Sequence, residues 1–306
     1  MNSLSAEALA ALKQLAVDTG KASADDDAFN GANLGAIQSM FRSANADDSS
    51  DEDNESDSDD TAPDFSDWET HIFAFGDVEV KAVQAPSAFN GTGADESGTV
   101  IWGASLYLSQ WLSHNRQYIK QKHVIELGCG CGIASVFAAL LGAQSVLATD
   151  YVRKVLTQTQ HHISLNELDN MSVDVVDWYA VLSGEAKAPI QADLLMASDV
   201  IYGSSNVEPL MATIDACTKP SGIVVIATRD GRMGVTDFVA LMKAHVGYKE
   251  ITVCEFAKES DNVPQLLDRD DCRQRWDSSH TVYVYQKQEI IEQGADFPAA
   301  VAEAHQ

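Results

Sequence analysis

The sequence feature that most constrains the fold is an alternation of short apolar runs with longer runs of helical spacing, from about residue 123 to residue 246. Each apolar run has the length of a buried strand, and the run that follows it has apolar residues at helical spacing. The apolar runs are HVIEL (123–127), SVLATD (145–150), SVDVVDW (172–178), DLLMASDVIY (193–202) and GIVVIATR (222–229). A strand followed by a crossover helix, repeated four or five times, predicts right-handed βαβ units. We therefore predict an α/β fold with a doubly wound, mostly parallel, Rossmann-like sheet covered by helices on both faces.

Two further strands are predicted after this pattern, in KEITVCEF (249–256) and TVYVYQK (281–287). The polar loop between them has no helical pattern, so the pair is expected to form an antiparallel edge and to bring the sheet to seven strands.

The region before the pattern predicts an N-terminal β-hairpin. HIFAF (71–75) and VEVKAV (78–83) alternate apolar and polar residues on either side of the turn-forming pair Gly76-Asp77. A helix is then expected to begin near Gly103.

Charge narrows the classes of partner. The chain carries 46 acidic and 20 basic side chains, a formal charge of −26. Residues 47–60 (DDSSDEDNESDSDD) hold nine of the acids, and the rest of the chain is still acidic. Most of such a surface would repel a phosphate backbone, so we expect no nucleic-acid partner. Low hydrophobicity and dense like charge predict that residues 21–67 are a disordered, solvated arm after a short N-terminal helix.

Cysteine usage and the N-terminal residues bear on the compartment. Five cysteines form an odd set, and the first twenty residues lack the basic and continuously apolar regions of a secretory signal. We therefore expect a cytoplasmic protein, with the nucleus as a second compartment. The longest apolar stretch is far shorter than the roughly 20 residues that span a bilayer, so no membrane association is expected. Nothing in the sequence indicates a stable oligomer, and a monomer is expected.

The stretch VIELGCGCGIASV (124–136) joins the first strand of the pattern to its helix. In a sheet of this type, ligands bind beyond the carboxyl ends of the strands, where the strand order reverses, and this loop lies there. Glycines let the backbone approach a ligand closely, and the following helix N-terminus favours negative groups.

The spacing of the glycines separates the possible ligands. A phosphate-binding P-loop needs a Lys-Ser/Thr pair after its last glycine, but Ile133-Ala134 follows Gly132, so a P-loop is excluded. A dinucleotide fingerprint would place a glycine at position 133, which disfavours a nicotinamide cofactor and leaves it open. Cys129 and Cys131 lack a second Cys or His pair at zinc-site spacing, so we interpret them as small side chains that fill a tight loop.

Acidic residues stand at or near the ends of the first three strands. Asp150 ends the second strand, 22 residues after Gly128, where both dinucleotide enzymes and methyltransferases use a carboxylate to accept hydrogen bonds from ribose hydroxyls. Glu126 stands two residues before the first glycine, and Asp177-Trp178 ends the third strand. This combination resembles the class I, seven-strand, S-adenosylmethionine-dependent methyltransferases.

Two further motifs resemble one subgroup, the family 16 protein-lysine methyltransferases. ASDVIY (197–202) matches its D-x-x-Y motif, and GTVIWGASLYL, from Gly98, matches its Gly-x-x-x-Trp first helix. The resemblance covers roughly residues 73–287, and the acidic arm and the polar loop before residue 281 depart from it. We accordingly divide the chain into an N-terminal helix with acidic arm (1–67), a β-hairpin extension (68–100), a methyltransferase domain (101–290) and a C-terminal tail (291–306).

The resemblance implies an S-adenosylmethionine-dependent N-methyltransferase that acts on a lysine of a protein substrate. It implies donor contacts by Trp102 and the Gly128, Gly130 and Gly132 loop at the methionine portion, Asp150 at the ribose, Asp177 and Trp178 at adenine, and Ser198 beneath the ring. Glu126 is expected either to position the loop or to meet the amino group of the methionine portion. Asp199 is expected to recruit the substrate ammonium, and Tyr202 to line its channel.

Several residues have purely structural alternatives. Trp102 could be core, Asp199 could cap the helix that follows it, and Tyr202 could be buried with its hydroxyl satisfied. His161 and His162 are expected at solvated helix positions without a catalytic role. The alternative functions are a small-molecule N-methyltransferase, an NAD-dependent oxidoreductase and a non-catalytic interaction protein on the same fold.

Overall fold

The computed structural model describes residues 65–84, 94–256, 265–266 and 279–289. The predicted N-terminal helix, nearly all of the acidic arm and the C-terminal tail lie outside these ranges. The division of the chain at residues 67, 100 and 290 therefore stays a prediction.

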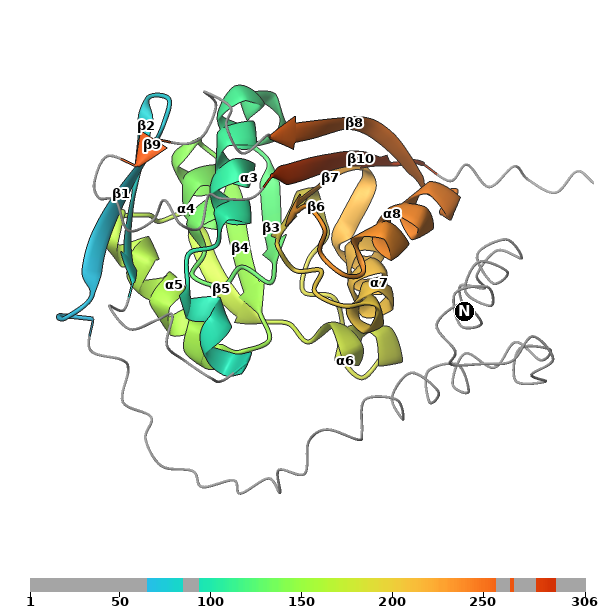
Figure 1. Cartoon of the computed structure of the whole chain (residues 1–306), viewed down its shortest axis with the longest axis horizontal. Helices are drawn as coiled ribbons and strands as arrows, with labels where there is room; N and C mark the ends of the chain where they lie inside the picture. Colours follow the sequence, from blue (N-terminus) through green and yellow to red (C-terminus); the bar gives the residue numbers. More distant parts are fainter. Residues whose placement is uncertain (1–64, 85–93, 257–264, 267–278, 290–306) are drawn as a thin grey trace, which may run out of the picture.

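A seven-stranded sheet forms the centre of the fold, as the sequence predicts (Figure 1). Its strands are β3 (His123–Leu127), β4 (Ser145–Asp150), β5 (Met171–Val175), β6 (Ala192–Ser198), β7 (Thr218–Arg229), β8 (Tyr248–Phe256) and β10 (His280–Lys287). They lie in the order β5-β4-β3-β6-β7-β10-β8, and β3 pairs in parallel with both β4 and β6. The chain therefore builds one half of the sheet outward from β3 and resumes on the other side at β6, which makes the β3/β6 boundary the switch point.

The predicted antiparallel edge is confirmed, with an order that the sequence did not reveal. β10 pairs antiparallel with both β7 and β8, so the last strand lies between them and β8 becomes the edge. Burial explains this order, because Val282, Val284 and Tyr285 of β10 are fully covered while Ile251 and Val253 of β8 are exposed.

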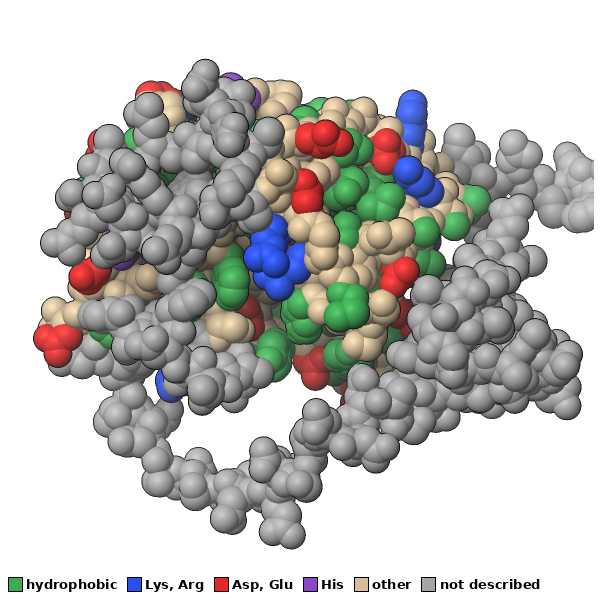
Figure 2. Space-filling view, viewed as in Figure 1, with side chains coloured by type: hydrophobic (Ala, Val, Ile, Leu, Met, Phe, Trp, Pro, Cys, Tyr) green, Lys and Arg blue, Asp and Glu red, His purple; other side chains and the backbone are tan. Residues whose placement is uncertain are grey.

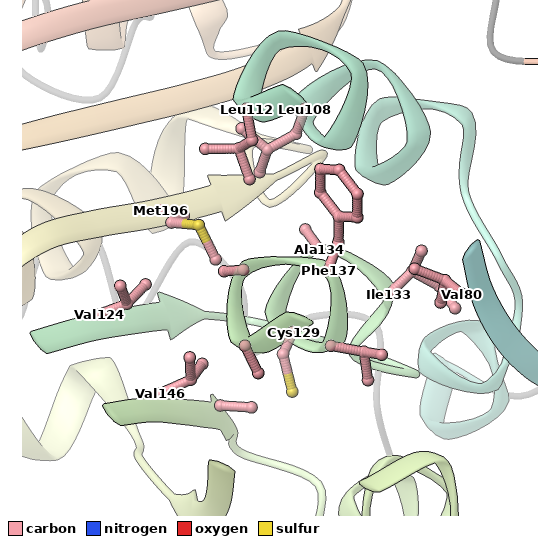
Figure 3. Packing of buried hydrophobic residues seen from close by; sticks show 14 of the residues in the cluster. Val80, Leu108, Leu112, Val124, Cys129, Ile133, Ala134, Phe137, Val146 and Met196 are labelled. Carbon is pink, nitrogen blue, oxygen red and sulfur yellow. The ribbon is translucent and has the colours of Figure 1, made fainter. Parts of the chain in front are cut away.

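Helices cover both faces of the sheet (Figure 1). On one face lie α3 (Gly103–His114), α4 (Ile133–Leu140) and α5 (Arg153–Leu165), and on the other α6 (Trp178–Ser183), α7 (Val207–Cys217) and α8 (Val235–Ala244). Short 3-10 helices, η2 (Ala94–Thr99), η3 (Arg116–Tyr118) and η4 (Ser204–Asn206), lie in the connections. Figure 3 shows Phe137 of α4 directed toward Leu108 and Leu112 of α3, so these two helices share one buried core.

The predicted hairpin is formed by β1 (Glu69–Phe75) and β2 (Val78–Gln84), and the short strand β9 (Gln265–Leu266) adds to its outer side, pairing with β1. Phe73, Phe75 and Val80 are buried in the same core as α4. The rings of Phe75 and Phe137 lie 4.8 Å apart. The hairpin therefore covers α4 and α5 as a third layer.

This layer corrects one prediction. His162 does not lie at a solvated helix position but is fully buried on α5, beneath the hairpin. Its Nε2 accepts a hydrogen bond from the Val83 amide (2.9 Å), which leaves Nδ1 as the donor to the Cys131 carbonyl (2.7 Å). The surface of α5 that the sequence assigned to solvent is covered by β2, a contact between segments far apart in the chain.

The surface of the molecule reflects the high content of acidic residues in the sequence. On the face seen in Figure 2, acidic side chains are scattered among hydrophobic and polar ones, around a central group of basic side chains. None of the helices in the described ranges has both the length and the apolar character that a membrane span requires.

Candidate active site

A cavity of about 660 Å³ lies at the carboxyl ends of the central strands, on both sides of the β3/β6 switch point. Gly128 follows β3, Asp150 ends β4, Val176 follows β5 and Ser198 ends β6, and all four line the cavity. This is where ligands bind in sheets of this topology, and the volume suits a small organic molecule.

The glycine loop forms one wall and is shaped for close approach. Gly128 has φ +63°, and a Cβ there would lie 2.7 Å from a methyl carbon of Val200. Gly130 has φ +53°, and a Cβ there would lie 2.9 Å from the Gly98 carbonyl oxygen. Both positions therefore exclude larger residues, so the backbone itself forms the surface. Gly132 begins α4 behind the loop and does not line the cavity.

Asp150 holds this loop from the adjacent strand. Its carboxylate accepts hydrogen bonds from the amides of Gly130 (3.1 Å) and Val152 (3.0 Å), and the residue is 8% exposed. Burial raises the pKa of the Asp150 carboxyl above its usual value. Each oxygen keeps a lone pair beyond these bonds, so the group can still accept hydrogen bonds from a diol in the cavity.

Glu126 lies deeper, inside β3, and is not part of the cavity wall. One of its oxygens accepts a short hydrogen bond from the Ser135 hydroxyl of α4, and its Oε1 has no partner among the described residues. Complete burial raises the pKa of Glu126 to about 7. Two roles were expected for Glu126. Its hydrogen bond with Ser135 of α4 favours the role of positioning the glycine loop.

Asp177 and Trp178 stand at the start of α6. Trp178 lines the cavity, and its ring lies 3.4 Å from the position of a Cβ on Gly128. Asp177 also lines the cavity and caps α6, because its Oδ1 accepts from the amides of Tyr179 (2.8 Å) and Ala180 (3.4 Å). The sequence predicted that Asp177 and Trp178 contact the ligand, but it did not predict that Asp177 caps α6.

Trp102 stands just before α3. It lines the cavity and is half-buried, and its indole N–H donates to the Ser97 carbonyl (2.9 Å), so it is not a core residue. Trp111, by contrast, packs in the core with 4% exposure and stacks on Tyr118.

Asp199 and Tyr202 follow β6 and differ sharply in their surroundings. Asp199 adopts φ +54°, and both of its carboxylate oxygens accept hydrogen bonds from Arg232, at 3.0 and 2.6 Å. It caps no helix, so that alternative is wrong. Tyr202 lines the cavity and is 60% exposed, which also rules out a buried structural tyrosine.

Comparison with known proteins identifies the family. Residues 86–245, just over half of the chain, match the lysine methyltransferase family. The chain belongs to the lysine methyltransferase family. It is 30% identical to the mouse protein-lysine methyltransferase METTL21E over 192 residues, which cover 60% of this chain and 74% of that protein. It is 27% identical to the Xenopus tropicalis protein N-lysine methyltransferase METTL21A over 151 residues, which cover 48% of this chain and 67% of that protein.

Family membership decides between the cofactors that glycine spacing left open. A lysine methyltransferase uses S-adenosylmethionine, and the NAD-dependent oxidoreductase is set aside. The cavity fits this donor, because it offers a bare backbone at Gly128 and Gly130, a carboxylate at Asp150 for a ribose, and the ring of Trp178 beside them.

The buried cysteines of the glycine loop fill space in this methyltransferase. Cys129 and Cys131 are 6% and 3% exposed and belong to the core. Burial raises the pKa of the Cys129 thiol well above its usual value, so it remains protonated. Within the described ranges, no group of three or more His, Cys, Asp or Glu side chains is arranged to hold a metal ion.

Sequence reasoning missed several residues at the site, among them Asn206 in the cavity wall and Arg232 beside it. Arg232 lies in the loop between β7 and α8, 33 positions after the Asp199 that it binds, and no local pattern marks it. Asn206 lines the cavity with 3% exposure, and its side-chain Nδ2 donates to the Val200 carbonyl (2.6 Å). Its place just before α7 resembled an ordinary helix start, and this concealed its position at the site.

Proposed function

We propose that this protein transfers the methyl group of S-adenosylmethionine to the side-chain amine of a lysine in another protein, with Asp199 and Tyr202 at the acceptor end of the cavity. The observation that carries the proposal is that the glycine loop, Asp150 and Tyr202 line one continuous cavity. The two curated relatives named above are both described as protein-lysine methyltransferases.

We assign the donor contacts as follows. The backbone of the loop from Gly128 to Cys131 and Trp102 face the methionine portion, Asp150 the ribose, Asp177 and Trp178 the adenine, and Ser198 lies beneath the ring, whereas Gly132, which does not line the cavity, has no donor contact. Glu126 acts through Ser135, which holds the first turn of α4 behind the loop. The bound donor supplies a methyl group that is already activated on a positively charged sulfur. The protein therefore has to align the acceptor and present it without charge, which can contribute several kcal/mol.

Tyr202 is suited to receive the amine. Desolvation, followed by the neighbouring Tyr151, raises the pKa of Tyr202 above its ordinary value of 10, so its hydroxyl stays protonated near neutral pH. A protonated hydroxyl accepts a hydrogen bond from an amine N–H through its lone pairs, which fixes the direction of the nitrogen lone pair. We assign no general base, and the proton of the arriving ammonium leaves to water.

The test is labelling of a cell extract with S-adenosylmethionine that carries an isotopic methyl group. Label in a protein band, mapped by mass spectrometry to a lysine, is the expected result. Label in small molecules alone would favour the small-molecule alternative, and no label would favour a non-catalytic interaction protein.

Two variants test the acceptor residues. Tyr202→Phe should lower kcat by about tenfold to a hundredfold, with donor affinity by calorimetry unchanged, because only the acceptor loses a hydrogen bond. Asp199→Ala should also lower transfer. Full activity of both variants would contradict the proposed acceptor end.

The remaining assignments are also proposals. We place the protein in the cytoplasm, with the nucleus as a second compartment, and as a monomer that binds neither nucleic acid nor membrane. The charge of −26 supports the absence of nucleic acid, and the buried thiols of Cys129, Cys131 and Cys217 suit a reducing compartment.

A further inference from the structure

The ion pair between Asp199 and Arg232 lies beside the cavity, since Asp199 stands between the lining residues Ser198 and Val200, and only its acidic half belongs to the family motif. Arg232 Nε donates to one carboxylate oxygen (3.0 Å) and its terminal nitrogen to the other (2.6 Å), a bidentate geometry. The Asp199 side chain is 5% exposed, so water screens the pair weakly. The guanidinium also lies over the ring of Trp102, 5.6 Å from its centroid, which ties the pair to the donor wall.

The backbone fixes Asp199 in this place. Its φ of +54° lies in the left-handed region, which L-residues rarely adopt. Its amide donates to the Ala227 carbonyl of β7 (2.8 Å), and Arg232 follows the same strand. β7 and its loop therefore hold both the main chain and the side chain of Asp199, between Ser198 and Val200 of the cavity wall.

The other ionisable groups on the surrounding elements leave Arg232 as the partner of Asp199. They are Glu126 on β3, Asp150 on β4, Tyr202 on the same loop, Arg229 at the end of β7, Asp230 just after it, and Asp237 on α8. Four of the acids are occupied elsewhere: Glu126 by Ser135, Asp150 by backbone amides, Asp230 by Thr281 (2.7 Å) and Asp237 by Ser204 (2.6 Å). Arg229 is exposed at the end of β7.

We infer that Arg232 is a positioning residue that cancels the charge of Asp199, so that a neutral pair, and not a bare carboxylate, lies beside the cavity that receives the substrate amine. The inference rests on the proposed function and changes the part of Asp199 in it. With both oxygens bound by Arg232, Asp199 is neutralised and does not act as an anionic attractor of ammonium.

The physical reason is the protonation of the nucleophile. A lysine amine has a pKa of about 10.4 and must lose its proton before it can attack. An unpaired carboxylate nearby would favour the charged ammonium and raise the pKa of the lysine amine by about 1–3 units. When the carboxylate is paired with a cation, desolvation lowers the pKa of the amine instead. Cancelling the charge of Asp199 therefore increases the fraction of bound lysine that can react at neutral pH.

The test uses the pH dependence of kcat, measured with saturating donor and the purified acceptor protein identified by extract labelling. The acidic limb of kcat reports ionisation in the bound complex, whereas that of kcat/KM reports the free reactants. Arg232→Gln should move the limb of kcat up by about one pH unit, and Asp199→Asn should move it down by about one unit. The double variant, which restores a neutral pair, should return it close to the wild-type position.

Controls separate charge from structure. Arg232→Lys keeps the positive charge, so the acidic limb of kcat should stay at the wild-type pH even if the rate is lower. Arg229→Gln removes a nearby charge that does not contact Asp199, so the limb should again stay in place. Binding of S-adenosylhomocysteine by calorimetry shows that each variant keeps the donor site.

The outcomes are distinct. A purely structural role of the pair would lower the rate of both single variants without moving the limb, and that result would overturn the inference. A lower KM and a faster Arg232→Gln variant at neutral pH would also overturn it, because Arg232 would then be a plug that the substrate displaces. If Arg232→Gln fails to fold, Asp199→Asn and the double variant still decide. Absence of an acceptor for the wild-type protein would instead count against the proposed function.

Discussion

The two ends of the cavity are built in different ways. At the donor end the wall is backbone, at Gly128 and Gly130, held by the buried carboxylate of Asp150. At the proposed acceptor end the side chain of Tyr202 forms the wall and is 60% exposed, and Asp199 beside it is held by Arg232 from a distant loop. If the proposed function is correct, donor binding depends on local chain geometry, while acceptor recognition depends on contacts between segments far apart in sequence.

The sharpest test of the donor end is Gly130→Ala. A Cβ at this position would lie 2.9 Å from the Gly98 carbonyl oxygen, on a residue with φ +53°. The strained backbone and the clash together should cost about 3 kcal/mol, and calorimetry should show roughly a hundredfold weaker binding of S-adenosylhomocysteine.

Gly142→Ala is the matched control for this variant. Gly142 has φ +85° with nothing within 4 Å of an added Cβ, so it carries the backbone cost without the clash. Its stability should fall by about 1 kcal/mol and its donor affinity should not change. Equal effects of the two variants on donor binding would contradict the view that the loop backbone is the binding surface.

The same contrast explains what the sequence predicted. Strand and helix periods and the spacing of Glu126, Gly128 and Asp150 are local, and they predicted the sheet, the loop and the donor end. The place of β10 between β7 and β8, the burial of His162 and the pairing of Arg232 with Asp199 were missed. Each depends on which distant segment packs against the residue, and single-sequence patterns do not encode that.

His162→Phe tests how much the buried hydrogen bonds of His162 contribute to holding the hairpin on the core. The variant leaves the Val83 amide and the Cys131 carbonyl without their buried partner, so the free energy of unfolding should fall by about 2–3 kcal/mol in denaturant titrations. His162→Gln, which can still accept and donate, should lose less. Equal stability of wild type and His162→Phe would show that the hairpin is held by apolar packing alone.

The same residue has a pH signature. Burial lowers the pKa of His162 from 6.5 to about 4, so the folded protein keeps it neutral while the unfolded chain takes up a proton. Its contribution to stability is full above pH 6.5 and is lost as the pH falls through about 4. Glu126, whose pKa burial raises to about 7, acts in the opposite direction, since its contribution is full below pH 4.5 and lost as the pH rises through 7. His162→Phe should therefore gain stability relative to wild type between pH 6.5 and 4.

The smallest expected effect concerns Asp177, where a structural and a binding role share one side chain. Its Oδ1 caps α6, and its second oxygen makes no hydrogen bond to the described residues. Asp177→Asn keeps the cap, because Asn and Asp are equally good at that position, but turns the second oxygen into a donor that cannot accept from an adenine amino group. Stability should then stay within about 0.5 kcal/mol of wild type, and donor affinity should fall about fivefold, the equivalent of one hydrogen bond.

Asp177→Ala removes both the cap and the second oxygen, and it should therefore also lose about 1 kcal/mol of stability. If Asp177→Asn binds the donor as tightly as wild type, the residue is only a cap, and the adenine end depends on Trp178 and the backbone like the rest of the donor wall.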